Sequence, residues 1–436
     1  MDNIEASRQR PNLHAQLDQR TVKIRLGVMM AFLIIPISCW WVTVATYIEQ
    51  NTGAAGNGMF SGGFVGKAYA TGALGAMISP LIWGAVADRY IAAERIMAAL
   101  QVAAAFLLWQ LTRVTTEQGW WWTMLAWAFC FSPQLGLANA VCFRHLDDPE
   151  RTFPPIRAIL TLSWVMGGWI VGYVAPWWFG RSIEATLLPM QIGIVFHLIA
   201  AVACLVVPST PPLPVADGEG KTGGGLRRFH FQSLKAVFGS ELALPVVAMT
   251  LLAVSVQFYM HLVHVFLSDN QVKGALGHLS WGQVTEIGFV LLLPLAFSRM
   301  GIKWVLVVGG TCWCVRFLLL WAAESTTLWL YWPSILLHGI CFSFTYLAIQ
   351  IYADRVSPPG SRASIQGLIS FLMSGVGALL GSQFTSWTQV HFLPAGGEYN
   401  WRRVWILAAV LAAIPTVMML FVRSSEPQIQ ARSASE

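Results

Sequence analysis

The sequence predicts an all-α polytopic membrane protein with twelve spanning helices arranged in two halves of six. Of its 436 residues, 56% are hydrophobic and only 11% are charged, and the mean hydropathy is +0.59. Soluble proteins carry about 25% charged residues. A spanning helix needs about 20 mostly apolar residues. Twelve runs of this kind lie at 25–48, 64–87, 93–112, 119–143, 155–178, 185–207, 241–267, 279–299, 303–323, 328–353, 363–388 and 401–423.

The longest connection between apolar runs, 208–240, divides the chain into two halves. It combines a proline pair, a triple glycine at 223–225 and several basic residues, a composition typical of a linker. The predicted organisation is a cytoplasmic N-terminal segment at 1–24, a six-helix bundle at 25–207, a cytoplasmic linker at 208–240, a second six-helix bundle at 241–423 and a cytoplasmic tail at 424–436.

Positive charge predicts the orientation of the chain in the bilayer. Lys and Arg residues outside the apolar runs concentrate in the N-terminal segment, the linker, the tail and the loops on the same side. The opposite loops hold only a few, namely Arg113, Arg181, Lys273, Arg402 and Arg403. The positive-inside rule therefore places both termini in the cytoplasm. The net charge of +6 is spread over short loops, so nucleic acid is not an expected partner.

The sequence holds no arrangement typical of an enzyme or a metal site. The seven cysteines all fall in apolar segments, without partners at zinc-ligand spacing, and are expected to be packing residues. Motifs of hydrolases, metalloproteases and ATP-driven pumps are missing from the sequence. We therefore expect neither enzyme activity nor a cofactor, and energy for uphill transport would have to come from an ion gradient.

Two polar residues, Gln283 and Glu286, interrupt the apolar run 279–299. They are three residues apart, so they share one face of a helix. An acidic residue at the centre of a spanning helix costs about 2.5–3.5 kcal/mol on insertion scales. Such a residue usually faces a bundle interior or a wet cavity and indicates a functional site. Glu286 is therefore a candidate for substrate binding and for proton transport.

A second polar stripe opens the run 155–178. Arg157 follows a Pro-Pro pair at the first helical turn, and Thr161 and Trp164 lie four and seven residues further on the same face. A cation, a hydroxyl and an aromatic ring are the contacts that an amphiphilic ring such as a nucleobase or a sugar requires. The alternative is that Arg157 extends to the lipid headgroups and that Trp164 belongs to the core.

The run 241–267 carries Gln257, His261 and His264. Two histidines three residues apart could bind a metal, but no third ligand lies nearby in sequence, so no metal is expected. Either histidine could take up a proton near neutral pH. Either could also form a hydrogen bond to a neighbouring helix instead.

The loop after the second run carries GAVADR at 84–89. Together with the two halves of six helices and the basic linker, it resembles the major facilitator transporters, whose signature in this loop contains G-x-x-x-D-R. In that fold the substrate site lies between the halves near the membrane midplane. The resemblance implies a cytoplasmic gate at Asp88 and Arg89, in which Asp88 caps a neighbouring helix. Ordinary solvated loop charge is the alternative.

Several further stretches resemble one family within this superfamily, the nucleoside:proton symporters. They are SPQLGLAN at 132–139, FPPIR at 153–157, QVTE at 283–286, SRMGIK at 298–303 and VSPPGSRASIQG at 356–367. The resemblance covers about residues 23–423. It implies that nucleosides contact Arg157, Thr161, Trp164, Gln257, Gln283 and Glu286. Three of the family's positions differ here: Trp164 stands in place of a Phe, Met260 in place of an Asn and Ser343 in place of an Asp. The change at Met260 bears on base recognition, and the change at Ser343 bears on proton coupling.

The function expected from the sequence is proton-coupled import of nucleosides by alternating access across the bacterial cytoplasmic (inner) membrane. With Ser343 in place of the acid, the coupling proton is expected on Glu286, His261 or His264. The expected partners are the nucleoside, protons and lipid, and a monomer is expected. Alternatives are a sugar or other small-molecule symporter or facilitator of the same fold, and a substrate sensor that does not transport.

Overall fold

The computed structural model describes residues 18–53, 58–212, 235, 237–323, 326–357, 361–392 and 399–423. Residues 1–17 of the N-terminal segment, most of the linker and the tail at 424–436 lie outside the described residues, as do 358–360 of the stretch at 356–367.

The first half of the chain forms helices, some of which are broken within one apolar run. The helices are α1 (Gln19–Leu33), α2 (Ile35–Trp40), α3 (Val44–Gln50), α4 (Phe64–Arg89), α5 (Ala93–Leu111), α6 (Glu117–Phe131), α7 (Gln134–His145), α8 (Pro149–Trp169), the π-helix η1 (Ile170–Val174), α9 (Ala175–Phe179) and α10 (Leu188–Val206). Pro36 lies in the first turn of α2 and Pro133 precedes α7, so each marks a break within one apolar run. Asp148 caps α8 by accepting a hydrogen bond from Arg151 N.

The second half contains one helix of 48 residues, α13, and two spans that are interrupted by π-helical turns. Its elements are α12 (Ala243–Asp269), α13 (Ala275–Ala322), the 3-10 helix η2 (Leu328–Leu330), α14 (Tyr331–Leu336), α15 (His338–Phe342), the π-helix η3 (Ser343–Leu347), α16 (Ala348–Val356), α17 (Arg362–Ser370), the π-helix η5 (Phe371–Gly377), α18 (Ala378–Phe392) and α19 (Trp401–Met419). Inside α13, Gly301 has φ 68° and ψ 170°, which is not a helical conformation.

The described residues contain ten helices that are long and apolar enough to cross a membrane. An eleventh is formed if Leu328–Leu336 and His338–Val356, which meet at an angle of 42°, count as one broken span. This confirms the prediction of an all-α polytopic membrane protein. The apolar runs 93–112 and 185–207 correspond closely to α5 and α10.

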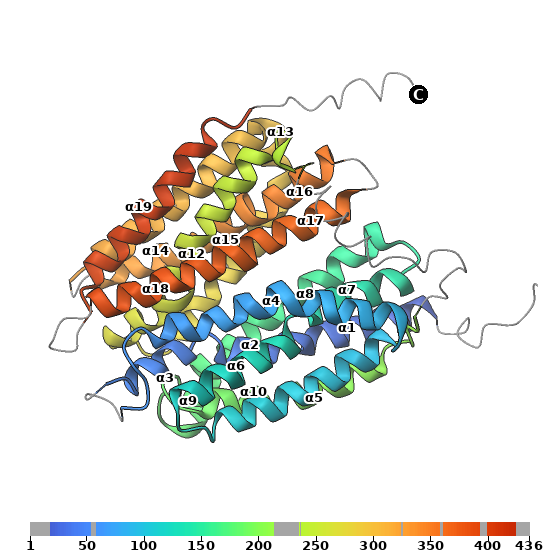
Figure 1. The fold of residues 1–436 in the computed structure, drawn as a ribbon, viewed down its shortest axis with the longest axis horizontal. Helices are drawn as coiled ribbons and strands as arrows, with labels where there is room; N and C mark the ends of the chain where they lie inside the picture. Colours follow the sequence, from blue (N-terminus) through green and yellow to red (C-terminus); the bar gives the residue numbers. More distant parts are fainter. Residues whose placement is uncertain are drawn as a thin grey trace, which may run out of the picture.

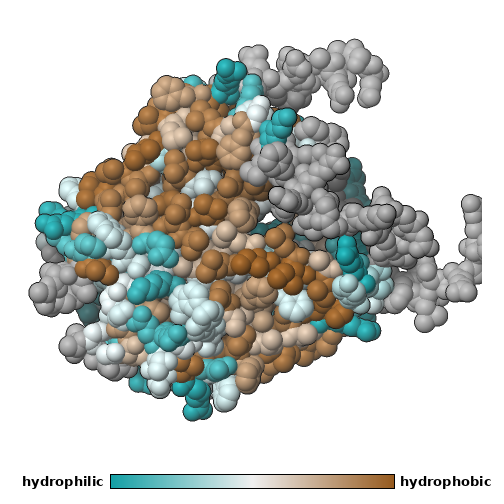
Figure 2. Space-filling model, viewed as in Figure 1, coloured by the Kyte–Doolittle hydropathy of each residue, from teal (hydrophilic) through white to brown (hydrophobic). Residues whose placement is uncertain are grey.

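Helices α1–α10 and α12–α19 form two bundles, drawn in blue to green and in yellow to red in Figure 1. Each bundle has its own core of buried aliphatic and aromatic side chains, such as Trp120 in the first and Trp313 in the second. Large apolar side chains also cover the exterior, and Figure 2 shows them spread over both bundles. Leu291 and Phe421, for example, are 76% and 72% exposed. An apolar exterior of this kind suits contact with lipid.

The two bundles meet most closely at one end, which we name the closed end. It carries the ends of α3, α9, α12 and α18 and the starts of α4, α10, α13 and α19, and it lies at the left of Figure 1. Two glycines permit the contact. A Cβ atom on Gly66 would lie 2.5 Å from Ser386 N of α18, and one on Gly172 would lie 2.7 Å from Gly277 Cα of α13. Any larger residue at either position would separate the bundles here.

Candidate functional site

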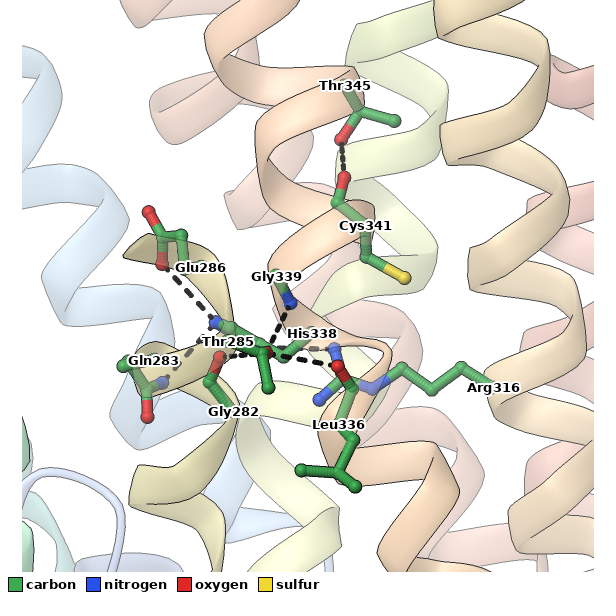
Figure 3. Close-up of polar contacts among 10 residues, drawn as sticks. All are labelled: Gly282, Gln283, Thr285, Glu286, Arg316, Leu336, His338, Gly339, Cys341 and Thr345. Carbon is green, nitrogen blue, oxygen red and sulfur yellow. Dashed lines mark hydrogen bonds and ion pairs between the residues drawn. The ribbon is translucent and has the colours of Figure 1, made fainter. Parts of the chain in front are cut away.

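The polar pair of α13 meets a histidine of the broken span. Glu286 Oε2 lies 3.8 Å from His338 Nε2, and the Gln283 amide lies 3.3 Å from the same nitrogen. Figure 3 shows both α13 side chains directed toward His338, which begins α15. The Glu286 side chain is 28% exposed, whereas that of His338 is 4% exposed. The carboxylate can therefore reach a ligand while its partner stays buried.

The Thr285 hydroxyl joins α13 to the backbone of the broken span around His338. Thr285 Oγ1 lies 3.0 Å from Leu336 O and accepts a hydrogen bond from Gly339 N at 3.2 Å. A Cβ atom on Gly339 would lie 2.5 Å from Thr285 C, so glycine is required for this approach. The contact fixes His338 beside Glu286 and does not depend on either side chain.

Arg316 determines which nitrogen of His338 carries the proton. Arg316 Nη1 lies 3.1 Å from His338 Nδ1, and a guanidinium can only donate, so Nδ1 accepts. In the neutral ring, Nε2 then carries the hydrogen and faces the Glu286 carboxylate. The orientation of the Gln283 amide is consistent with this assignment. When its nitrogen donates to Leu279 O and Ser280 O, at 3.0 and 3.2 Å, its oxygen turns toward His338 and can accept the Nε2 hydrogen.

The guanidinium of Arg316 is fully buried inside the second bundle. It stacks over the ring of Tyr259 at 3.4 Å from the centroid and lies 5.0 Å from that of Trp313. Within the described part of the chain, Arg316 forms no ion pair with a carboxylate. Its charge is therefore balanced by aromatic faces and, through His338, by Glu286.

The polar stripe of α8 faces this group from the first bundle. Helices α8 and α13 pack together, and Trp169 and Trp281 meet across the interface with ring centroids 5.3 Å apart. The Arg157 guanidinium and the Glu286 carboxylate interact electrostatically across the bundles. Arg157 is exposed, and Thr161 and Trp164 are half-buried further along the same helix. Arg157 and Glu286 therefore lie within electrostatic range of each other without forming an ion pair among the described contacts, and Thr161 and Trp164 lie further along the helix that carries Arg157.

Gln257 lies on α12, half-buried, and packs against α18. A Cβ atom on Gly381 would lie 2.5 Å from Gln257 Cγ, and the Gln257 amide nitrogen donates to Ala253 O at 3.4 Å. No described hydrogen bond ties Gln257 to the pair on α13. Met260, three residues on, is also half-buried, whereas Ser343 is buried at the start of η3 and its hydroxyl has no partner in the described part of the chain.

The two histidines of α12 both contact the first bundle. His261 is buried and stacks on Tyr69 of α4, with ring centroids 4.1 Å apart. His264 Nδ1 lies 2.6 Å from Thr46 Oγ1, and its Nε2 lies 3.6 Å from Glu184 Oε1. Among the described residues, no group of three or more His, Cys, Asp or Glu side chains could hold a metal ion.

Asp88 and Arg89 end α4 and are exposed. Asp88 lines a cavity of about 580 Å³ with residues of the same bundle, including Pro133, Arg144 and Pro212. This places the pair in the first bundle, apart from Glu286. The capping role of Asp88 stays a prediction.

Sequence reasoning missed His338. The sequence signal was a histidine within the apolar run 328–353, followed by a glycine that could allow close helix contact. Its partner Gln283 is 55 residues away in sequence, so spacing alone could not pair them. Glu184 was missed as well, because it lies in a loop, where an acidic residue is unremarkable.

The chain is similar to known transport proteins over nearly its whole length. The family model described as nucleoside H+ symporter matches residues 20–427. YegT of Escherichia coli is 30% identical over 416 residues, covering 93% of this chain and 95% of its own length. The nucleoside permease NupG of Escherichia coli is 25% identical over 409 residues, covering 89% and 92%. A crystal structure of a mutant of the nucleoside transporter NupG superposes with a TM-score of 0.81 at 22% identity, covering 92% of this chain and 99% of that one.

These relatives are transporters, and the fold is that of a transporter. The match of the family model spans nearly the whole chain. The chain belongs to the nucleoside H+ symporter family.

Proposed function

We propose that this chain imports nucleosides together with protons across the bacterial cytoplasmic membrane by alternating access. The observation that supports it best is that α8 packs on α13, which places the Glu286 carboxylate of one bundle within electrostatic range of the Arg157 guanidinium of the other. A site shared between two bundles can be exposed to either side of the membrane in turn when the bundles rock. A nucleoside is the kind of ligand that such a site suits, since it has a flat polar base and a sugar with vicinal hydroxyls.

In this proposal the base stacks on Trp164, and Arg157, Thr161, Gln257 and Gln283 bond its polar edges. Glu286 accepts hydrogen bonds from the ribose hydroxyls. Charge-assisted bonds of this kind are stronger than neutral ones, and leaving the carboxylate without partners in a dry site is costly.

Glu286 is also the proposed proton carrier. It is a partly exposed acidic side chain that contacts His338 in its own bundle and is within electrostatic range of Arg157 in the other. His264 is a second candidate, because it is already engaged by Thr46 and Glu184 at the closed end. His261 is the weakest of the three, since its ring is buried against Tyr69.

The proposed topology has twelve spans with both termini in the cytoplasm. A continuous helix of 48 residues would be about 72 Å long, more than twice the ~30 Å hydrocarbon core. We therefore divide α13 at Gly301 into two spans and count the broken span as one. The closed end then faces the periplasm, Asp88 and Arg89 form a gate at the cytoplasmic end, and the protein works as a monomer.

The test is uptake of labelled uridine and adenosine by cells that lack their own nucleoside permeases. We expect both to accumulate, and accumulation to collapse when a protonophore removes the proton gradient. Glu286→Gln, expressed to the same level in the membrane, should accumulate neither nucleoside. If neither nucleoside enters above the level of cells without the protein, the proposed substrate class is wrong.

A further inference from the structure

We propose that His338 and Arg316 form a positioning pair for the polar face of α13, with His338 as the donor that holds Gln283 beside the Glu286 carboxylate and Arg316 as the fixed cation behind both. This rests on the proposed function, in which Glu286 contacts the nucleoside. It goes further, because it assigns roles to two buried residues that lie behind the site.

The geometry carries the donor role of His338. Its Nδ1 is occupied by the Arg316 guanidinium at 3.1 Å, which leaves Nε2–H as the only donor of a neutral ring. That nitrogen is within hydrogen-bond distance of the Gln283 amide, at 3.3 Å, whereas Glu286 Oε2 lies 3.8 Å away and is an electrostatic neighbour rather than a hydrogen-bond acceptor. One imidazole therefore links a buried cation to both polar residues of α13, as Figure 3 shows.

The charge of Arg316 requires such a link. A fully buried guanidinium is costly unless it is paired or bonded. The rings of Tyr259 and Trp313 compensate part of that cost, and the sulfur of Cys341 lies beside it. Among the described residues, the carboxylate nearest along a chain of polar contacts is Glu286, one imidazole away.

Glu286 is thus influenced by two cations, one in each bundle. Arg157 belongs to the other bundle and is exposed, so its distance changes if the bundles move. Arg316 and His338 belong to the same bundle as Glu286 and are buried, so they move with it. The pair would keep the carboxylate oriented, and its charge partly balanced, in every state of the transport cycle.

The first test compares two substitutions of the histidine. His338→Gln keeps a donor close to the position of Nε2, whereas His338→Asn is too short to reach Glu286. We expect His338→Asn to raise the KM for uridine uptake about tenfold, because Gln283 loses its hydrogen bond to the imidazole and Glu286 loses its polar neighbour, with a smaller change in maximal rate. His338→Gln should recover most of the affinity. Equal loss in both variants would overturn the donor role.

The pH profile of uptake separates positioning from packing. Without the buried cation in Arg316→Met, or without the imidazole that links this cation to α13 in His338→Asn, the Glu286 carboxylate binds a proton more readily, so the acid limb of the profile should move to higher pH in both variants. A purely structural loss would lower uptake at every pH and leave the limb in place, which would contradict the proposal. His391→Asn and His391→Gln, on the exposed face of α18 beside Trp387, are the matched controls and should change neither KM nor profile.

The second test needs no nucleoside. The thermal midpoints of ligand-free purified protein are measured for Arg316→Met, Glu286→Gln and the double variant. If the two charges balance each other, the double variant loses less than the sum of the single losses. If Arg316→Met does not fold, His338→Phe takes its place in the cycle. Additive losses in the thermal midpoint would overturn the proposal that Arg316 and Glu286 act as a pair. If the losses are not additive but the unmodified protein takes up no nucleoside, only the proposed function is wrong.

Discussion

At the scale of single residues, the central feature is a carboxylate that is neither buried nor free. Glu286 is partly exposed, with Arg157 on one side and His338 on the other. A carboxylate within reach of cations is favoured in its charged form, whereas burial favours the neutral form. The two influences oppose each other at Glu286. A change in the distance to Arg157 can therefore change its protonation, which is what a coupled transporter requires.

We expect Glu286→Gln to separate exchange from accumulation. The amide keeps the shape and can still bond ribose hydroxyls, but it cannot take up or release a proton. In proteoliposomes, counterflow of labelled uridine should persist at reduced affinity, while accumulation driven by an imposed pH gradient should vanish.

The control for that experiment is Asp354→Asn, which removes an exposed ion pair with Arg362 at 3.9 Å and should leave both measurements within about twofold. Accumulation that survives in Glu286→Gln would move the coupling proton to another group, His264 first.

At the scale of elements, the change of direction within α13 depends on one glycine, Gly301. Gly301 adopts φ 68° and ψ 170°, a region of backbone conformation that is essentially restricted to glycine. The helix on each side continues in a new direction from this point. The gap between the predicted runs 279–299 and 303–323 falls at the same residue.

We expect Gly301→Ala to destabilise the protein by about 1–3 kcal/mol, the usual cost of such backbone strain. A Cβ atom there would meet nothing within 4 Å, so the loss would come from the backbone alone. Gly288→Ala on the same helix is the matched control, since it is equally free of contacts and has helical backbone. It should stabilise by about 0.5–1 kcal/mol. Thermal midpoints in detergent measure both, and equal midpoints would show that Gly301 is not strained.

Element boundaries show what the sequence can predict. Apolar length located α5, α10 and α12 to within a few residues, because burial in lipid leaves a strong compositional signal. It missed the breaks at Ile34 and at Leu337, because one or two non-ideal residues do not change the hydropathy of a run. Spacing along one helix likewise found Gln283 with Glu286, whereas His338 required the fold to bring a distant segment into contact.

At the scale of the whole molecule, the closed end is joined by buried polar contacts between the bundles. Glu184 accepts a hydrogen bond from Leu276 N at 2.7 Å and lies beside His264. On the opposite flank, Gln389 accepts from Gly66 N at 3.2 Å and donates to Glu49 and to Tyr399.

The Tyr399 hydroxyl belongs to this second group of contacts. Burial, followed by the nearby Glu49 carboxylate, holds the pKa of Tyr399 well above its usual range, so the hydroxyl stays protonated as a donor. The two flanks thus join the bundles through directional bonds that must all break before this end can open.

Gly66 is the position at which closure can be tested. A Cβ atom there would meet Ser386 of α18, so Gly66→Ala should hold the bundles apart at this end. Overpacking of this kind costs about 1–3 kcal/mol, which corresponds to a shift of about 5–150-fold in the equilibrium between closed and open. Hydrogen exchange measured by mass spectrometry should quicken in peptides from 60–66 and 382–392, and nucleoside uptake should fall by about tenfold or more.

Gly84→Ala, on the same helix, provides the comparison, because a Cβ atom at Gly84 would meet nothing within 4 Å. It should leave exchange at the closed end unchanged. If Gly66→Ala also leaves exchange unchanged while uptake falls, the glycine serves transport in some way other than closing the bundles. If exchange quickens and uptake stays normal, closing this end is not a required step, and alternating access through it is wrong.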